Sequence, residues 1–207
     1  MQLIFLRHGQ SEANLLKIIA NRGWKYPLTT LGRSQAKQAA AYLAGEALIA
    51  VYSSPLMRAV ETAEILAQGF NLEVQVTKSL CEFDCGEMEG RSDAEAWKSH
   101  YAVSQRWQSG EKQSRITGGE SLQDVLNRFL PFITGLSENH PAQSKILLVG
   151  HGGLYRHVLP ELCKNITTLY SAGHELKNTD IVRVENWSDG WWCTQWAKDI
   201  LPYWKRS

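Results

Sequence analysis

Short runs of apolar residues recur along this chain, and most of them are followed by a segment with helical spacing. The apolar runs predict strands at residues 3–6, 49–52, 73–76 and 145–149, and the periodic segments predict helices at residues 31–43, 56–68, 120–136 and 152–162. Thr29 or Thr30 can serve as N-cap of the first of these helices. Strands that alternate with helices indicate an α/β fold with a largely parallel sheet.

The two most apolar runs, LIFL at residues 3–6 and KILLV at residues 145–149, read as strands buried on both faces. Near the end of the sequence, residues 181–187 and 191–196 flank the turn Ser-Asp-Gly at 188–190, which predicts an antiparallel hairpin. We therefore expect a three-layer sandwich with a mostly parallel sheet, helices on both faces and antiparallel edge strands.

The segment from about residue 93 to 119 differs from the rest, because it is polar, carries Trp97, Tyr101 and Trp107, and ends in a Gly-Gly break. We interpret it as a small helical cap inserted at about 91–118 into a single domain that spans residues 1–207.

Composition excludes several classes of protein. Of the 207 residues 43% are hydrophobic and 21% are charged, with a formal net charge of +1, so overall charge gives no case for a nucleic-acid binder. No apolar run approaches the roughly 20 residues that span a bilayer. The first apolar run is too short for a signal-peptide core, and four cysteines are too few for a disulfide framework. We expect a cytoplasmic protein with reduced cysteines and no membrane partner.

Charged and imidazole side chains follow three of the predicted strands. The first strand runs into Arg7-His8-Gly9, the second is followed by a helix with Arg58 in its first turn, and the fourth ends at His151 between glycines. Because ligands of open α/β sheets bind beyond the carboxyl ends of the strands, these side chains are expected to share one crevice.

Two arginines and two histidines in one crevice suit a phosphate dianion, since a guanidinium can hold two phosphate oxygens and stays charged. We see no metal-binding set of residues, so these side chains would neutralise the phosphoryl charge in place of Mg²⁺. A histidine in such a cradle can be the nucleophile, and the leaving oxygen then needs a proton from a carboxylic acid. Glu82, Asp84, Glu87 and Glu89 in the acidic loop after the third strand are the candidates, and the spacing to Gly86 favours Glu82.

With these residues in place, the sequence resembles the histidine phosphatase superfamily, in its phosphoglycerate mutase-like branch. The resemblance rests on six blocks in family order: RHGQSEAN at 7–14, PLTTLGRSQA at 27–36, SSPLMRAVETA at 53–63, the acidic loop at 82–90, GGES at 118–121 and VGHGG at 149–153. A lone Arg-His-Gly would be weak, whereas the ordered set spans nearly the whole chain.

The resemblance implies a role for each matching residue. His8 would be the phosphorylated nucleophile, and Arg7, Arg58 and His151 would bind and neutralise the phosphoryl group. Glu82 would be the general acid and then the base for the attacking water. Ser11, Asn14 and the Gly152 amide would line the phosphate or substrate end.

One departure from the family lies in residues 22–27, which lack an acidic residue that many relatives have there. This loop usually borders the substrate, so Gly23 and Trp24 are taken as further substrate-binding candidates. Trp24, Trp97 and Trp107 could wall a substrate pocket.

Residues outside these blocks have plainer interpretations. His100, His140 and His174 are expected at the surface, and His157 is expected to be structural. Arg156, one turn beyond Gly152, could reach the cleft but is more often a cation on a helix surface.

The sequence thus favours a metal-independent phosphomonoesterase of the histidine phosphatase type, which hydrolyses a small phosphorylated metabolite through a phosphohistidine on His8 and needs no cofactor. The alternative is a phosphoglycerate mutase that uses the same phospho-His8, and a third, weaker hypothesis is a non-catalytic binder of phosphorylated ligands. The short cap favours the phosphatase by analogy with the family. The tryptophan-rich C-terminal hairpin is a candidate dimer edge, which would make the protein a homodimer.

Overall fold

The computed structural model describes residues 1–201, and in these residues one sheet forms the centre of the molecule. Its strands are β1 (Gln2–Arg7), β2 (Leu48–Ser53), β3 (Val74–Val76), β4 (Lys145–Gly150), β5 (Ile181–Trp187), β6 (Gly190–Trp196) and β7 (Asp199–Ile200). They lie in the order β3-β2-β4-β1-β5-β6-β7. The first four of these are mutually parallel, and β5, β6 and β7 continue the sheet in antiparallel pairing. The predicted mixed sheet and its antiparallel hairpin are confirmed.

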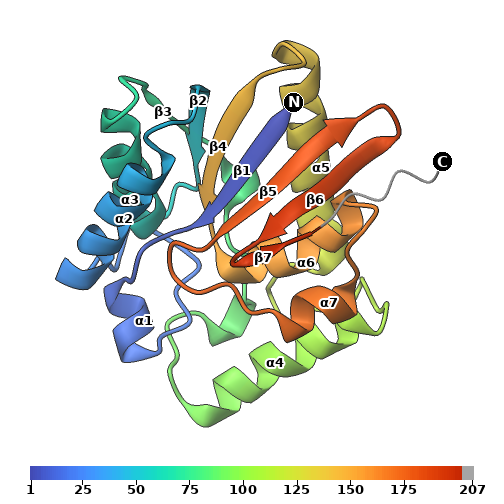
Figure 1. Cartoon of the computed structure of the whole chain (residues 1–207). Helices are drawn as coiled ribbons and strands as arrows, with labels where there is room; N and C mark the ends of the chain where they lie inside the picture. Colours follow the sequence, from blue (N-terminus) through green and yellow to red (C-terminus); the bar gives the residue numbers. More distant parts are fainter. Residues whose placement is uncertain (202–207) are drawn as a thin grey trace.

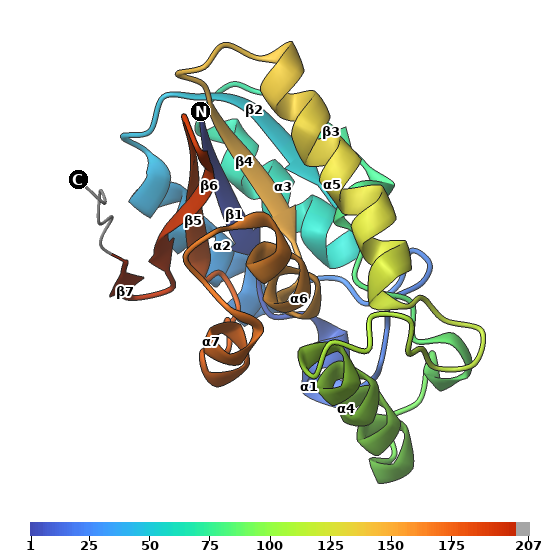
Figure 2. The same cartoon turned by 90° about the vertical axis from the view of Figure 1, so that its right-hand side faces the viewer.

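Helices cover both faces of the sheet (Figures 1 and 2). The helices are α1 (Glu12–Leu16), α2 (Thr30–Leu43), α3 (Met57–Gln68), α4 (Ala94–Gln108), α5 (Leu122–Asn139), α6 (Gly152–Leu162) and α7 (Thr168–Gly173), with 3₁₀ turns at Lys78–Leu80 and Gly86–Met88. Helices α2 and α3 pack on one face and α5 and α6 on the other, whereas α1, α4 and α7 lie beyond the carboxyl end of β1. The helices expected at residues 31–43, 56–68, 120–136 and 152–162 correspond to α2, α3, α5 and α6.

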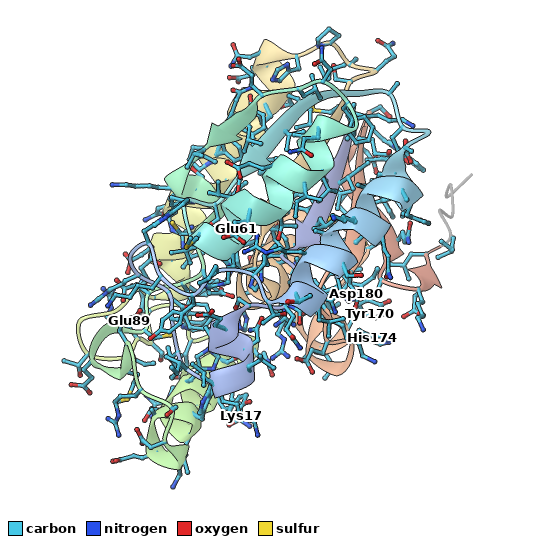
Figure 3. All side chains as sticks on the ribbon, turned by 90° about the vertical axis from the view of Figure 1, so that its left-hand side faces the viewer. Lys17, Glu61, Glu89, Tyr170, His174 and Asp180 are labelled. Carbon is cyan, nitrogen blue, oxygen red and sulfur yellow. The ribbon has the colours of Figure 1, made fainter. Side chains whose placement is uncertain are left out.

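Local sequence signals set where these helices begin. Thr29 is the N-cap of α2, and its hydroxyl accepts a hydrogen bond from the Gly32 amide at 3.0 Å. Ser121 and Asp124 form a capping box at the start of α5. Glu61 joins α3 to α2 and to the loop before α2. Its carboxylate pairs with Arg33 of α2 at 2.7 Å and accepts a hydrogen bond from the Leu28 amide at 3.0 Å (Figure 3).

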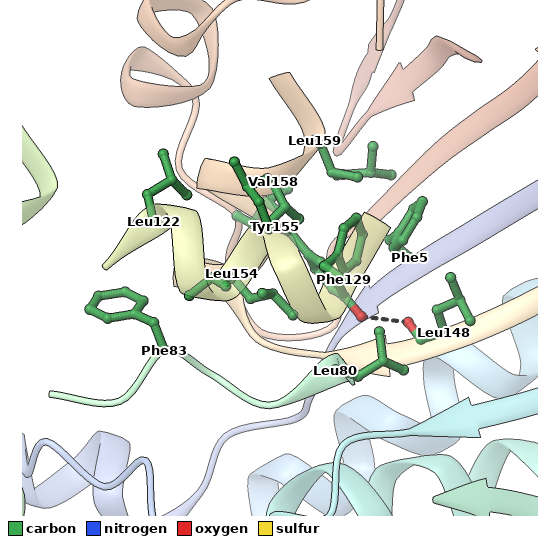
Figure 4. Packing of buried hydrophobic residues seen from close by; sticks show 14 of the residues in the cluster. Phe5, Leu80, Phe83, Leu122, Phe129, Leu148, Leu154, Tyr155, Val158 and Leu159 are labelled. Atoms are coloured by element: carbon green, nitrogen blue, oxygen red, sulfur yellow. Dashed lines mark hydrogen bonds between the residues drawn. The ribbon is translucent and has the colours of Figure 1, made fainter. Parts of the chain in front are cut away.

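Alternate residues of β1 point to the two faces of the sheet and enter two separate cores. Leu3 and Phe5 belong to the larger core, under α5 and α6, while Ile4 and Leu6 belong to the core under α2 and α3. Figure 4 shows the larger core, where the ring of Tyr155 packs edge-on against Phe5 with centroids 5.2 Å apart. The Tyr155 hydroxyl donates to the Leu148 carbonyl of β4 at 2.8 Å and so fixes the first turns of α6 on the sheet.

The segment predicted as a cap, residues 91–118, contains α4 and a loop that returns to α5. Asp93 caps α4, and its carboxylate accepts a hydrogen bond from the Ala96 amide at 3.1 Å. Ala96, Val103 and Trp107 are buried and hold α4 against the larger core. This leaves α4 beside the carboxyl end of the sheet.

Candidate active site

The register of the sheet brings three strand ends together. Arg7 at the end of β1 lies opposite Gly150 at the end of β4, and Ser53 at the end of β2 lies opposite Val149. The next residues continue this pairing, since the His8 amide donates to the Gly150 carbonyl at 3.0 Å. His8 and His151 therefore become neighbours, with ring centroids 5.1 Å apart.

His8 is held in one defined tautomer. Its Nδ1 lies 2.7 Å from the Gly9 carbonyl oxygen, which can only accept, so Nδ1 carries the proton. Nε2 is then unprotonated, and it accepts a hydrogen bond from Arg58 Nε at 3.0 Å. Burial, followed by the nearby charges of Arg58 and Arg7, holds the pKa of His8 well below its usual value. His8 is thus a neutral imidazole with the lone pair of Nε2 directed toward Arg58.

Arg58, which is buried, and Arg7, which is half-buried, bring two positive charges to this imidazole. Arg58 also donates from Nη1 to the Ala20 carbonyl at 2.8 Å, and burial lowers its pKa to about 10. Arg7 donates from Nη1 to the Leu176 carbonyl, while its Nε is buried and has no hydrogen-bond partner among residues 1–201. Neither guanidinium forms an ion pair with a carboxylate within the described part of the chain. The site is therefore suited to an anion that supplies the missing negative charge.

His151 lies against the same arginine. Its Nε2 is 2.8 Å from the Ser54 hydroxyl, and its Nδ1 is 3.4 Å from Arg58 Nη2. Burial and the charge of Arg58 lower the pKa of His151 well below its usual value. A dianion bound beside it would offset that charge, so His151 could then take up a proton and donate to a phosphoryl oxygen.

Glu82 is the carboxylate that shares the pocket with these groups. Its Oε2 accepts a hydrogen bond from the Gly153 amide at 2.9 Å and its Oε1 accepts from the Phe83 amide at 3.1 Å. Burial raises the pKa of Glu82, and the two amides and the arginines oppose that shift. A Cβ atom on Gly153 would lie 2.7 Å from Oε2, so only glycine lets α6 approach the carboxylate this closely.

Asp84 and Glu89, two other acidic residues of the loop, bind neighbouring backbone amides and Arg22. Asp84 accepts the Gly86 amide at 2.8 Å and pairs with Arg22 at 2.7 Å. Glu89 accepts the backbone amides of Asn21 and Arg22 at 2.9 and 3.0 Å (Figure 3). These carboxylates hold the loop around residues 21–22 in place and do not line the pocket around His8.

The pocket has a volume of about 230 Å³ and includes most of the residues singled out from the sequence. Arg7, His8, Asn14, Arg58, Glu82 and Gly152 line it, and His151 lies directly behind Arg58 and His8. Ser11 does not line the pocket, because it is fully buried as the N-cap of α1. Its hydroxyl donates to Asn14 Oδ1 at 3.2 Å and so orients Asn14.

Gly23 and Trp24 lie outside the pocket, and 59% of Trp24 is exposed. Of the three tryptophans expected to wall the pocket, Trp97 lines it, whereas Trp107 is buried in the core and donates to the Ser114 carbonyl at 2.7 Å. The rim near residues 22–27 therefore contributes less of the wall than the sequence suggests, and α4 contributes more.

The outer wall of the pocket comprises Trp97, His100 and Tyr101 of α4, Arg156 of α6 and Glu175. Sequence reasoning proposed Trp97 for this wall and missed His100 and Glu175. The expectation that His100 lies at the surface is wrong, because His100 lines the pocket, stacks on Phe83 at 5.1 Å and has a buried Nδ1. Arg156 also gave a signal in the sequence, through its position one turn beyond Gly152. His157 is buried and lies 2.9 Å from the Ser104 hydroxyl, as expected for a structural histidine.

Metal ligands and membrane-spanning helices were both sought in the described residues. Within residues 1–201, no group of three or more His, Cys, Asp and Glu side chains converges as metal ligands would. None of the helices in that range has the length and apolar character needed to cross a bilayer.

A mixed sheet whose parallel strands end at two histidines and at two arginines without a carboxylate partner in residues 1–201, all near one pocket, defines a phosphoryl-binding α/β protein. The sequence profile of the histidine phosphatase superfamily (branch 1) matches residues 3–199, and the chain belongs to this superfamily. It is an enzyme of the phosphatase type.

Individual relatives bear different names. A 2,3-bisphosphoglycerate-dependent phosphoglycerate mutase of Methylocella silvestris is 37% identical over 180 residues, which cover 78% of this chain and 81% of the relative. A bifunctional protein of Mycobacterium tuberculosis is 35% identical over 190 residues, which cover 83% of this chain and 51% of the relative. The chain thus spans about half the length of that mycobacterial relative.

Among solved structures, a mycobacterial glucosyl-3-phosphoglycerate phosphatase in complex with VO3 superimposes with a TM-score of 0.83 and 28% identity. The match covers 96% of this chain and 99% of that one.

Proposed function

We propose that this protein is a phosphomonoesterase that hydrolyses a small phosphorylated metabolite through a phosphohistidine on His8. One observation carries the proposal: the unprotonated Nε2 of His8 lies in the same pocket as two unpaired guanidinium groups and the carboxyl of Glu82. A nucleophile, a receptor for the phosphoryl charge and a proton donor are the three parts that the reaction needs.

In the first step, the phosphoryl group binds between Arg7 and Arg58, whose charges stabilise its equatorial oxygens. Arg58 Nε gives up its hydrogen bond to His8 Nε2 and donates to a phosphoryl oxygen instead. The freed lone pair of Nε2 forms a bond to phosphorus as the bond from phosphorus to the ester oxygen breaks. The protonated carboxyl of Glu82 gives its proton to that departing oxygen. The Gly9 carbonyl, bonded to Nδ1, stabilises the positive charge that the imidazole acquires.

In the second step, a water molecule attacks phosphorus from the side of Glu82. The Glu82 carboxylate accepts a proton from this water, the bond between phosphorus and Nε2 breaks, and inorganic phosphate leaves. His8 and Glu82 then return to their starting protonation states. The raised pKa of Glu82 and the lowered pKa of His8 support this division of roles, because the first shift favours a protonated carboxyl and the second a neutral imidazole.

We further propose that the reaction needs no metal ion, since two guanidinium groups and a protonated His151 would supply the positive charge that Mg²⁺ supplies in many other phosphoryl-transfer enzymes. Turnover is expected to be unchanged by EDTA. Strict dependence on added Mg²⁺ would contradict this part of the mechanism.

Phosphoglycerate mutase activity is the second candidate, and the name of the Methylocella relative favours it. A mutase must keep water away from the phosphoenzyme until the phosphoryl group returns to the acceptor. The region that would exclude water is residues 91–118, which hold one helix, and the outer wall keeps exposed side chains such as Tyr101. This supports hydrolysis as the main outcome.

A panel of phosphorylated metabolites tests the proposal, with phosphate release and phosphoryl transfer to 3-phosphoglycerate measured in parallel. We expect phosphate release to exceed transfer with at least one substrate. Dominant transfer would favour the mutase, and tight binding without either reaction would favour a non-catalytic binder.

Two properties of the protein in the cell stay proposals as well. The four cysteines are free thiols, which supports a cytoplasmic location. The half-buried hairpin of β5 and β6, which lies next to the edge strand β7, stays a candidate dimer edge, for which gel filtration with light scattering is the measurement.

A further inference from the structure

Glu82 differs from the two histidines of the site in the support of its backbone. His8 and His151 directly follow β1 and β4, so the register of the sheet sets their positions. Glu82 lies in residues 81–85, which form neither helix nor strand and are called the acid segment below. A general acid must lie within hydrogen-bond reach of the oxygen that it protonates. The acid segment therefore needs a support other than the sheet.

The side chain of Arg128, on α5, contacts the backbone of the acid segment and of the turn before it. Its Nη1 donates to the carbonyl of Ser79 at 3.0 Å and to that of Lys78 at 3.3 Å. Its Nη2 donates to the Cys81 carbonyl at 3.0 Å and lies 3.5 Å from the Glu82 carbonyl. One planar guanidinium thus binds successive backbone carbonyls up to the candidate acid itself.

Glu120, which lies just before α5, orients this guanidinium and adds contacts of its own. Its Oε1 accepts from Arg128 Nε at 2.8 Å and its Oε2 from Nη2 at 3.0 Å, which makes a bidentate pair. The same Oε2 accepts a hydrogen bond from the Asp84 amide at 2.9 Å, and the Glu120 amide donates to the Asp84 carbonyl at 3.0 Å. Glu82 is therefore held from both directions along the chain.

These contacts bear directly on the carboxyl group of Glu82. Its Oε1 accepts from the Phe83 amide, which belongs to the acid segment, and its Oε2 accepts from the Gly153 amide of α6. A shift of the segment relative to α6 would break one of these bonds and move the carboxyl relative to His8. Arg128 is half-buried and does not line the pocket, so it can act on the reaction only through the groups that it holds.

We propose that Arg128 is a positioning residue for the general acid: together with Glu120 it fixes the acid segment and so sets where the Glu82 carboxyl meets the leaving oxygen. The inference rests on the proposed function, in which Glu82 is that acid. Lysine is a poor substitute at this position, because one ammonium group cannot reach the separate carbonyls and Glu120 at the same time.

Replacement of Arg128 by Lys tests the inference through the leaving group. In R128K, kcat/KM for an alkyl phosphate should fall by about 10- to 100-fold, because proton transfer depends on the position of the acid. For p-nitrophenyl phosphate, whose leaving group needs little protonation, the loss should stay below about threefold. The Kd of inorganic phosphate, measured by calorimetry, should be unchanged, since Arg7 and Arg58 still bind it. R128Q should lose more than R128K, because it keeps neither the charge nor the fork.

Combination with E82Q shows whether Arg128 acts through Glu82. In the E82Q background, R128K should lower kcat/KM for the alkyl phosphate by less than about threefold, because the residue that it positions no longer gives a proton. Arg115 supplies the matched control: it pairs with Asp124 of α5 at 3.0 Å and donates to the Ser121 hydroxyl at 3.3 Å, outside the acid segment. R115K should therefore behave as the unmodified enzyme.

Hydrogen exchange adds a measurement that needs no turnover. The Asp84 amide, bonded to Glu120, should exchange at least about tenfold faster in R128K, while the amides of β1 and β4 keep their rates. Equal losses with both substrates, full additivity with E82Q, or unchanged exchange in the acid segment would overturn the inference. If the unmodified enzyme releases phosphate from no substrate while R128K still speeds this exchange, the proposed function is overturned and Arg128 stands as the support of the acid segment.

Discussion

The two ends of the pocket are built in different ways. At the inner end, His8, Arg58 and His151 follow or pack against strand ends, each is at most 5% exposed, and each is hydrogen-bonded to its neighbours. At the outer end, Arg156 has no ion-pair partner among residues 1–201, and 56% of Tyr101 is exposed. The protein therefore positions the reacting groups of the inner end before a ligand arrives and leaves Arg7 Nε there for the ligand, whereas the outer end is not held in this way.

This difference indicates how chemistry and specificity are divided in the molecule. Changes at the inner end should affect every substrate, because all of them present the same phosphoryl group. Changes at the outer end should alter the ratio between substrates. Phe83 connects the two ends, since it follows Glu82 directly and its ring stacks on His100 of the outer wall.

Among changes that leave His8 in place, replacement of Glu82 by Gln should have the largest effect on turnover. Gln cannot give a proton to the leaving oxygen, so kcat/KM for an alkyl phosphate should fall by about 10²- to 10⁴-fold. For p-nitrophenyl phosphate, whose leaving group needs little protonation, the loss should stay below about tenfold. Steady-state assays with both substrates measure the difference.

The pH dependence of the same variant gives an independent control. Since His8 must be neutral and Glu82 protonated, kcat/KM should show an acidic limb from His8 below its usual pKa and an alkaline limb from Glu82 above its usual pKa. E82Q should lose the alkaline limb and keep the acidic one. Equal losses with both substrates and an unchanged alkaline limb would assign the acid to another residue.

A methyl group at Gly153 should have an intermediate effect. In G153A the new Cβ would lie 2.7 Å from Oε2 of Glu82, so the carboxylate must move. A displacement of this kind should lower kcat/KM for alkyl phosphates by about 10- to 100-fold, with a smaller loss for p-nitrophenyl phosphate. Gly173 has no neighbouring atom where a Cβ would stand, so G173A is the control and should behave as the unmodified enzyme. A fully active G153A would show that the position of Glu82 is not critical.

The smallest expected effect concerns the stability of the protein, and it arises at His157, whose ring packs edge-on against Phe83. His157 is 4% exposed, and burial, with added effects of Arg156 and His100, lowers its pKa to about 3. The unfolded chain binds a proton at His157 near pH 6.5 and the native protein does not, so stability is lost as pH falls below 6.5. The contribution of His157 is about 1.4 kcal/mol per pH unit in this range.

The variant H157Q cannot take up this proton, and its amide can keep a hydrogen bond to Ser104. Denaturant unfolding at pH 7, 6 and 5 should therefore show a shallower loss of stability in H157Q than in the unmodified protein. Parallel curves for the two proteins would contradict a neutral His157 in the native state.

Strands and helices were predicted correctly where the sequence has one strong hydrophobic pattern, either a continuous apolar run or a helical period. The runs at β1 and β4 are apolar throughout because both faces of these strands are buried, and α6 is bounded by His151 and Cys163 as the periodicity indicates. The short helices α1 and α7 were not found, since five or six residues carry too little periodicity to separate a helix from a loop.

The inner end of the pocket was predictable for a related reason. Arg7, His8 and His151 are attached to strand ends, and parallel strands in register bring their ends together whatever the side chains are. The outer end depends on which way long side chains of α4 and α6 point after packing. His100 on α4 shows this, because it was placed at the surface by residue type alone and the structure puts it in the pocket. Trp24 was placed by the family's substrate loop, and the structure leaves it outside the pocket.

The central claim is that His8 forms a covalent bond to phosphorus, and trapping the phosphoenzyme tests it most directly. The enzyme is mixed with a ³²P-labelled phosphomonoester, quenched in alkaline denaturant within milliseconds and analysed by peptide mass spectrometry. We predict a phosphoryl group on His8 that survives alkali and is lost in acid, and that is missing from H8Q. Continued turnover with no label on His8, or label on a different residue, would contradict the account.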